Sequence, residues 1–246
     1  DTHNRGKEVL RLFVKYGAPE SILYDAKPHI GTDILAKVVK NIREAIISMG
    51  GEVRFHTKVT GIRTKRSIDF SDEPALAMLH LEDTRTNIGE DLLTDVAILA
   101  IGHSARDTFG LLNLSDIKME PKPFAVGVRV EHPQDMIDES QYGKNAPESL
   151  PAAAYKLTAK TKEGRGVYTF CMCPGGYVVN ASSEENRLAV NGMSYSGRNG
   201  KNANSAVIVT VSPEDFPEKG ILGGLAFQRQ LEEAAFAEGQ GKIPVQ

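Results

Sequence analysis

Apolar residues recur with helical spacing in two early segments of the chain and alternate with polar residues in the segments that follow. The spacing predicts a helix over residues 5–16. A second helix is predicted from Thr32, as its N-cap, to Gly50-Gly51, which supplies a residue able to adopt positive φ. Alternation then predicts strands over residues 52–55, 58–63, 75–81 and 86–93.

The apolar run Val96–Ala100 has no polar interruption. Such a run is typical of a strand covered on both faces, as in a parallel sheet. It ends near Gly102, after which Ser104 is expected to cap a helix running to about Leu112. The order of these elements predicts an α/β unit.

From Met119 onward the pattern is mainly that of strands. They are expected at residues 124–131, 166–173, 177–181 and 206–211, with proline and glycine between them, before a last amphipathic helix at 225–238. This part predicts an antiparallel or mixed sheet with long loops. With a boundary near Pro121-Lys122-Pro123, we predict an α/β region over residues 1–120 and a β-rich domain over residues 121–246, so that the fold class is α/β or α+β.

Composition limits the function classes. A net charge of −3 over 246 residues gives no reason to expect nucleic acid or an anionic membrane as the main partner. No apolar run approaches the roughly 18–20 residues of a membrane helix. Two cysteines, Cys171 and Cys173, exclude a disulfide framework and are expected to be reduced thiols in a cytoplasmic protein. The start at Asp1 and the end at Gln246 are expected to be cuts in a longer polypeptide.

Several common motifs are missing from the sequence. It contains no Gly-x-Gly-x-x-Gly fingerprint and no phosphate-binding P-loop. It also lacks His-x-x-x-His and paired Cys-x-x-Cys spacings, which argues against a zinc site, so no metal is expected. Residues 192–197 nearly form the hydrolase nucleophile elbow, but the last glycine falls one residue late, which argues against a serine hydrolase.

Six segments together resemble one family, although each alone is a weak match. They are AKPHIGTD (26–33), GGEVRFHTKVTGI (50–62), ILAIGHSARDTF (98–109), KPFAVGVRVEHP (122–133), CMCPGGYVVNASSE (171–184) and NGMSYSGRNGKNANSA (191–206). The chain resembles the two-dinucleotide-binding-domain flavoproteins, and within them a bacterial group of uncharacterised FAD-dependent dehydrogenases. The resemblance implies that residues 1–120 are part of a Rossmann-like FAD/NAD(P)-binding domain and residues 121–246 a substrate-side domain.

The same resemblance implies cofactor-binding positions. In such flavoproteins an Ala-Thr-Gly-like stretch lies near the dinucleotide, and the matching residues are Ala100, Ile101 and Gly102, followed by His103. A glycine there lets the backbone pass close to a ligand, but a tight strand-to-helix turn needs a small residue as well. Val59 is implied to present backbone groups to the adenine, and it is equally suited to a hydrophobic core.

The family's glycine-rich phosphate loop is absent from these residues. We therefore expect the fragment alone to bind FAD weakly or not at all and to be inactive. The parent chain is expected to be an FAD-dependent oxidoreductase, dehydrogenase-like, acting on an unknown small molecule, with NAD(P)H as a further candidate partner. The alternative is a non-catalytic flavin- or ligand-binding module. Nothing in the sequence indicates the catalytic residues or the oligomeric state.

Polar and glycine-rich segments supply the substrate-side candidates. They are His29 beside a helix N-terminus, the turn glycines Gly175 and Gly176, and Asn191, Ser194 and Arg198 in a hydroxyl-rich segment. Arg198 suits a substrate carboxylate or a cofactor phosphate, or is simply solvated. Cys171 and Cys173 suit a redox pair or two thiols on one face of a strand. Asn202 and Asn204 are ligand donors or turn formers, and Arg129 and His132 are assigned to a solvent face.

Overall fold

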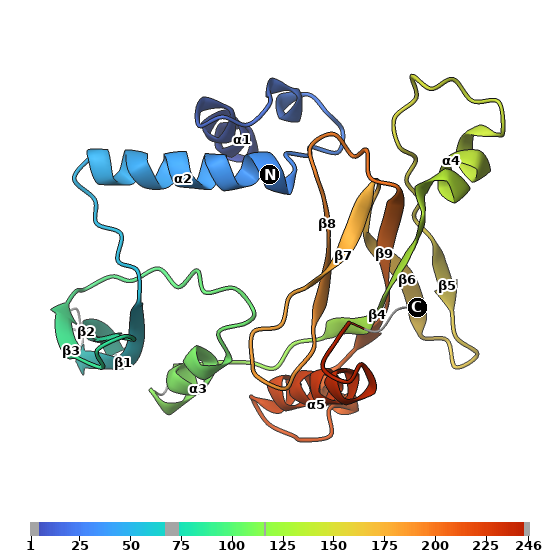
Figure 1. The fold of residues 1–246 in the computed structure, drawn as a ribbon. Coiled ribbons are helices and arrows are strands. Elements are labelled where there is room, and N and C mark those ends of the chain that lie inside the picture. The colour runs from blue at the N-terminus through green and yellow to red at the C-terminus, as the bar shows by residue number, and fades with distance from the viewer. Residues whose placement is uncertain (1–4, 67–73, 116, 244–246) are drawn as a thin grey trace. The chain divides into compact units, whose positions relative to one another are not determined.

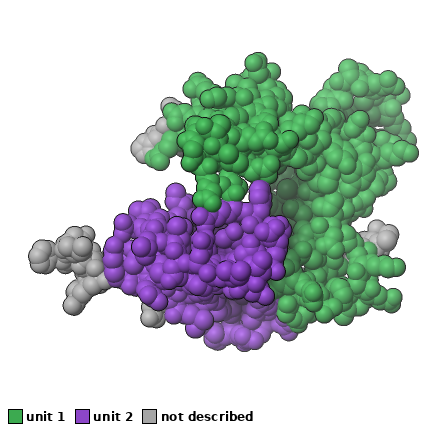
Figure 2. All heavy atoms as spheres, turned by 60° about the vertical axis from the view of Figure 1, so that its left-hand side comes forward, with its two compact units in different colours: residues 1–53, 124–211, 232–246 green, residues 54–123, 212–231 purple. Residues whose placement is uncertain are grey.

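A computed structural model describes residues 5–66, 74–115 and 117–243, and the chain forms two compact units, drawn in different colours in Figure 2. Unit 1 comprises residues 1–53, 124–211 and 232–246, and unit 2 comprises residues 54–123 and 212–231. The predicted mixed α+β class is confirmed, because in the described residues helices accompany three antiparallel sheets (Figure 1). The assignment of a flavin domain to residues 1–120 and a substrate domain to residues 121–246 stays a prediction.

Unit 1 begins with a small helical core. It contains α1 (Arg5–Lys15), the 3₁₀ turn η1 (Glu20–Leu23) and α2 (Thr32–Ser48), which confirms both predicted helices. Ala18, Ile22 and Val38 are buried between them, with partly buried side chains around them from Leu10, Phe13, Val14, Tyr16, Ile30, Ile34 and Ile42. Burial of this apolar surface, rather than helix propensity alone, stabilises such short helices.

The predicted cap of α2 was wrong by one position. The N-cap is Gly31, and Thr32 is the first helical residue. Gly31 has φ +87°, and a Cβ there would lie only 2.2 Å from the backbone nitrogen of Ser196. A side chain is therefore excluded where the chain enters this helix.

The main sheet of unit 1 is antiparallel throughout, in the order β4-β9-β6-β5. Its strands are β4 (Phe124–Pro133), β9 (Asn202–Val211), β6 (Gly166–Cys173) and β5 (Thr158–Lys160). Helix α4 (Gln134–Tyr142) follows β4 directly. A separate hairpin of β7 (Gly176–Asn180) and β8 (Val190–Ser194) lies alongside β9 (Figure 1). The predicted strands at residues 124–131, 166–173, 177–181 and 206–211 are thereby confirmed, whereas β5, β8 and α4 were not predicted.

Unit 2 contains a three-stranded antiparallel meander. Its strands β1 (Thr57–Arg66), β2 (Pro74–Asp83) and β3 (Gly89–Leu93) pair in sequence order. Helix α3 (Arg106–Leu114) and the 3₁₀ turn η2 (Pro213–Asp215) belong to the same unit, and α5 (Gly223–Glu238) contributes residues to both units. The capping box of Ser212 and Asp215 fixes η2.

Three sequence predictions in this region were wrong. Residues 52–55 and Val96–Ala100 are not strands, and α3 is capped at Ala105 rather than Ser104, without a side-chain cap bond. The run Val96–Ala100 has no partner strand among the described residues, and Val96 and Ile98 are 77% and 89% exposed. Since a strand exists only through its neighbours, an apolar pattern without a partner does not form one. In the part of the chain that is described, no helix combines the length and the apolar character needed to cross a membrane.

Candidate functional site

The turn after β6 and the loop after β8 are packed backbone to backbone. Gly175 adopts φ +56°, and a Cβ at this position would lie 1.9 Å from the carbonyl oxygen of Arg198. Its N–H donates to Oε1 of the buried Gln134 at 2.9 Å. Only glycine fits this contact, so the Pro-Gly-Gly sequence is explained by the close approach of the two segments.

The same loop is held from its other side by the start of α2. His29 Nε2 lies 3.1 Å from the carbonyl oxygen of Tyr195. The carboxylate of Asp33 accepts hydrogen bonds from the main-chain nitrogen of Ser196 at 2.8 Å and from its hydroxyl at 2.7 Å. These bonds, the hydroxyl bond first, lower the pKa of Asp33. Residues 195–200 are therefore clamped between α2 and the turn at Gly175.

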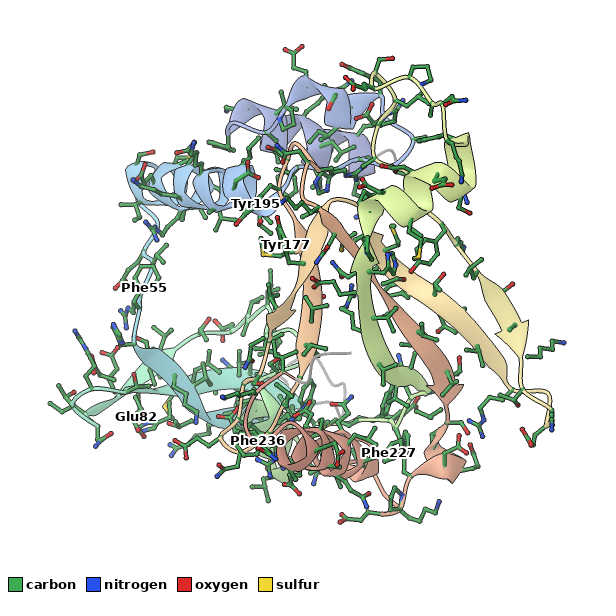
Figure 3. The ribbon with its side chains drawn as sticks, turned by 45° about the vertical axis from the view of Figure 1, so that its right-hand side comes forward. Phe55, Glu82, Tyr177, Tyr195, Phe227 and Phe236 are labelled. Carbon is green, nitrogen blue, oxygen red and sulfur yellow. The ribbon has the colours of Figure 1, made fainter. Side chains whose placement is uncertain are left out.

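Two tyrosines border this loop. The rings of Tyr177, on β7, and Tyr195, just after β8, meet edge to face with centroids 6.4 Å apart (Figure 3). Aromatic pairs of this geometry contribute beyond the burial of their area. A Cβ at Gly200 would lie 2.8 Å from the hydroxyl of Tyr177, so this glycine lets the phenol pack on the backbone.

The structure brings together five of the predicted substrate-side residues and separates the sixth. His29, Gly175 and Arg198 meet at the loop, and Gly176 pairs with Ser194, which is buried at the end of β8. Asn191 lies near the other end of β8, where its side-chain oxygen accepts a hydrogen bond from the main-chain nitrogen of Gly192. Their role in binding a substrate stays a prediction.

Arg198 is the cation of this loop. It adopts φ +47°, its main-chain nitrogen donates to the carbonyl of Tyr195 at 3.1 Å, and its Nε is buried without a partner among the described residues. A left-handed non-glycine residue is uncommon and is typical of loops whose conformation is fixed by their surroundings. The guanidinium therefore has an unused donor in a loop of fixed shape.

A polar layer lies between β4–β9 and the hairpin, and the sequence pattern did not reveal it. Arg129 donates to Oδ1 of Asn204 at 2.5 Å and to the carbonyl of Cys171 at 3.2 Å. Glu131 accepts from the main-chain nitrogen of Val178 at 2.7 Å and from the side chain of Asn202 at 2.5 Å. Glu131 therefore provides a partner for a main-chain N–H of β7 that is not paired with β8.

This layer corrects several predictions. Arg129 does not lie on a solvent face, and His132 Nε2 lies 2.8 Å from the hydroxyl of Tyr155. Asn202 and Asn204 are strand residues of β9 and not turn formers. Because β4 and β9 each look like ordinary alternating strands, only their register shows that polar residues of both share one face.

The two thiols differ in exposure, against the expectation that they share one face of a regular strand. Cys171 is exposed and has φ +49°, whereas Cys173 is buried. Burial, followed by the neighbouring Cys171, raises the pKa of the Cys173 thiol, and the charge of Arg129 acts in the opposite direction. No group of three His, Cys, Asp or Glu side chains that could hold a metal ion occurs among residues 5–66, 74–115 and 117–243.

The predicted cofactor-binding residues all lie in unit 2. Val59 is in β1 opposite Leu81, and Ala100, Ile101, Gly102 and His103 lie in the irregular segment before α3. Gly102 has φ +67°, and none of the other residues that the structure describes lies within 4 Å of the position of a Cβ there. Their contact with a cofactor stays a prediction.

An ion pair joins β1 to α3 near these residues. Lys58 Nζ lies 2.5 Å from Oδ2 of Asp107, in the first turn of α3. The hydrogen bond between them raises the pKa of Lys58 and lowers that of Asp107. The ion pair therefore holds the start of β1, which contains Val59, next to the start of α3.

Comparison with known proteins connects this architecture to flavoproteins. Residues 123–246 match the family described as FAD-dependent protein, C-terminal domain-like. An uncharacterised protein of Clostridium beijerinckii is 49% identical over 242 residues, which cover 97% of this chain and 43% of that relative. The chain thus spans less than half the length of this relative. With half of its residues matched, the chain belongs to the family of FAD-dependent proteins that carry this C-terminal-like domain.

Proposed function

We propose that the protein containing this chain is an FAD-dependent oxidoreductase of the dehydrogenase type, which acts on a small molecule bound by unit 1. Membership of an FAD-dependent family supports the cofactor. FAD, when bound, supplies transfer of a hydride or of electrons. The residues of this chain contribute binding and orientation.

The observation that carries the cofactor assignment is the open left-handed turn at Gly102. With φ +67° and no atom of the described residues within 4 Å of a Cβ position, this backbone has room for close approach by a dinucleotide, so the turn fits the group. Ala100, Ile101 and His103 flank it, and Val59 offers main-chain groups from β1. The loop that holds the pyrophosphate lies, in this proposal, outside residues 1–246, in keeping with a relative of which this chain covers 43%.

Arg198 is proposed to bind an anionic group of the small molecule. Its Nε is buried and has no partner among the described residues, and its loop is fixed by Gly175 and Asp33. A guanidinium in a preformed loop binds a carboxylate with two parallel hydrogen bonds. Its partner in the reaction, the electron donor or acceptor, is proposed to be a small molecule, with NADH and NADPH as the first to try.

The cofactor is tested by the absorbance spectrum of the purified full-length protein and of two glycine variants. Gly102→Ala and Gly220→Ala introduce the same methyl group at positive φ (+67° and +105°), each into open space and within unit 2. Both variants therefore carry backbone strain, and because φ +105° lies further outside the left-handed region that alanine tolerates, Gly220→Ala is the stricter control for stability. We expect a flavin spectrum for the unchanged protein and for Gly220→Ala, a reduced flavin content for Gly102→Ala, and no flavin in residues 1–246 alone. Equal flavin content in both variants would remove Gly102 from the site, and a full-length protein that stays colourless with added FAD would end the cofactor proposal.

The oxidoreductase proposal is tested by anaerobic reduction of the bound flavin. Bleaching of the flavin by NADH, NADPH or a candidate donor supports an enzyme, and Arg198→Ala is expected to raise the KM of an anionic substrate with little change in flavin content. A bound flavin that no donor reduces, and that dithionite does reduce, would support a non-catalytic flavin-binding module instead.

A further inference from the structure

The Cys171-Met172-Cys173 segment lies in an irregular part of β6. Phe170 pairs with Ala206 and Cys173 pairs with Asn204, so three steps along β6 are matched by two along β9. One extra residue is therefore inserted into β6, which is the definition of a β-bulge. Such insertions are over-represented beside active sites, where they redirect side chains.

The bulge places the two sulfurs in different surroundings within two residues. Cys171 is exposed, and Cys173 is 8% exposed, with its Sγ donating to the carbonyl of Cys171 at 3.3 Å. An exposed thiol is the one that a dissolved reagent reaches first, and a buried thiol next to it is placed to react second. Two thiols that serve only to fill a core would both be buried.

The bulge holds Cys171 in the left-handed conformation that bulges usually give to glycine. Its φ of +49° is a conformation that glycine or asparagine adopts more readily. The side chain is exposed, so the cysteine gains little burial in return. A strained conformation held at one member of a thiol pair is the kind of outlier from which a functional role is inferred.

The surroundings of the pair hold a cation and an unpaired amide donor, although burial still raises the pKa of the Cys173 thiol. The guanidinium of Arg129 donates to the carbonyl of Cys171, and its charge favours the thiolate of Cys173 against the opposing effect of burial. Asn204, opposite Cys173 in the ladder, is fully buried, and its Nδ2 has no partner among the described residues. A buried amide donor without a partner is costly unless a ligand or a charged group uses it.

We propose that Cys171 and Cys173 form a thiol–disulfide exchange centre for small-molecule disulfides, with Cys171 as the attacking thiol and Cys173 as the resolving thiol. The Cys171 thiolate attacks one sulfur of a disulfide RSSR, which forms a Cys171–S–S–R bond and releases RS⁻. Cys173 then loses its proton to solvent and attacks the Cys171 sulfur, which closes the Cys171–Cys173 bond and releases the second RS⁻. Two protein thiols are oxidised, and one RSSR is reduced to two RSH.

The centre returns to its thiol form by the reverse exchange with a dithiol. A disulfide between residues two apart closes a small, strained ring, and strained disulfides are the readily reduced ones. The raised pKa of Cys173 makes the second step the slower one, so a mixed disulfide on Cys171 is expected to accumulate briefly. Only the thiols of this chain take part in the exchange, so the reaction does not depend on the flavin.

The experiment treats the reduced full-length protein with 2-hydroxyethyl disulfide, traps remaining thiols with iodoacetamide and analyses the tryptic peptide of residues 166–187. Both cysteines of this chain lie in that peptide, which contains no internal Lys or Arg. We expect the native protein to give first the Cys171 mixed disulfide and then a peptide lighter by two hydrogens. Cys173→Ser should stop at the mixed disulfide. In Cys171→Ser, the remaining Cys173 thiol should react at least about tenfold more slowly than Cys171 does in the native protein.

Cys171→Gly controls for folding. Glycine tolerates φ +49°, so this variant should unfold no more easily than the native protein while losing the exchange reaction. The proposal is overturned if both thiols of the native protein react at equal rates, or if the mixed disulfide on Cys171 persists and the internal disulfide never forms.

Discussion

Ser196 donates two hydrogen bonds to the carboxylate of Asp33, one from its main-chain nitrogen and one from its hydroxyl, although 163 residues separate them. The pair joins the first turn of α2 to the loop after β8. A short polar contact of this kind positions a loop without a large buried surface. The loop that carries Arg198 therefore depends on a helix formed early in the chain.

Replacement of Asp33 by Asn should loosen this loop. The amide keeps the shape of the carboxylate but has one acceptor oxygen in place of two and no charge, so one of the two bonds from Ser196 is lost or weakened. We expect faster hydrogen exchange in residues 195–201, with little change in the sheet. Asp135→Asn, in the first turn of α4 and exposed, is the matched control. Equal exchange in the two variants would show that Asp33 does not hold the loop.

The same contact should respond to acid. Because the pKa of Asp33 is lowered from 3.8, the carboxylate contributes stability that is complete above that value and is lost as the pH falls through the lower folded-state pKa. When the pH falls below about 4, amide hydrogen exchange in residues 195–201 of the native protein should therefore become faster than the pH dependence of exchange in an unstructured chain predicts. In Asp33→Asn this additional rise should be missing.

Asp83 should give a second acid transition, in the turn between β2 and β3. Its carboxylate accepts from the side chain of Arg85 and from the main-chain nitrogens of Arg85 and Thr86, and its pKa is lowered to about 2. The pKa is depressed, so the contribution is complete above 3.8 and disappears as the pH falls toward about 2. Carboxyl NMR titration should find Asp83 ionised at pH 3. A midpoint at or above 3.8 would show that these bonds are absent in solution.

Removal of the Arg129 guanidinium should destabilise the polar layer. Arg129→Met keeps an apolar stem but leaves Oδ1 of the fully buried Asn204 without its donor. We expect a loss of about 1–3 kcal/mol in the free energy of unfolding, measured by urea denaturation. The double variant Arg129→Met/Asn204→Leu removes both partners and should recover part of that loss. No recovery would indicate that the pair is not coupled.

Gly192 should be intolerant of a side chain. A Cβ there would lie 2.0 Å from Oδ1 of Asn204 and 2.1 Å from Nη1 of Arg129, so Gly192→Ala must displace this hydrogen-bonded pair or the hairpin itself. We expect a loss of about 1–3 kcal/mol in the free energy of unfolding. Gly166→Ala is the control, because Gly166 begins β6, needs no positive φ and has nothing within 4 Å of a Cβ position. A similar loss in both would contradict the close approach at Gly192.

Local pattern was enough to predict most helices and strands of unit 1, because their apolar faces are buried within that unit. It failed at Val96–Ala100, where a typical buried-strand pattern has no partner among the described residues, and at β8, where Gly192 interrupts the alternation. His29, Gly175 and Arg198 were each predicted as candidates from local sequence features, and nothing in the sequence indicated that they lie together. The layer of Arg129 and Glu131 could not be predicted, since it depends on the register of β4 with β9.

The inserted residue in β6 changes the parity of the strand. Thr169 and Cys173 are four positions apart and would share a face in a regular strand, yet they pair with Val207 and Asn204, which face opposite sides of the sheet. From the added residue onward, each side chain of β6 therefore lies on the face of the sheet opposite to the one it would occupy in a regular strand. In a regular strand of the same sequence, Met172 would lie opposite Asn204, with a thioether in place of the thiol of Cys173.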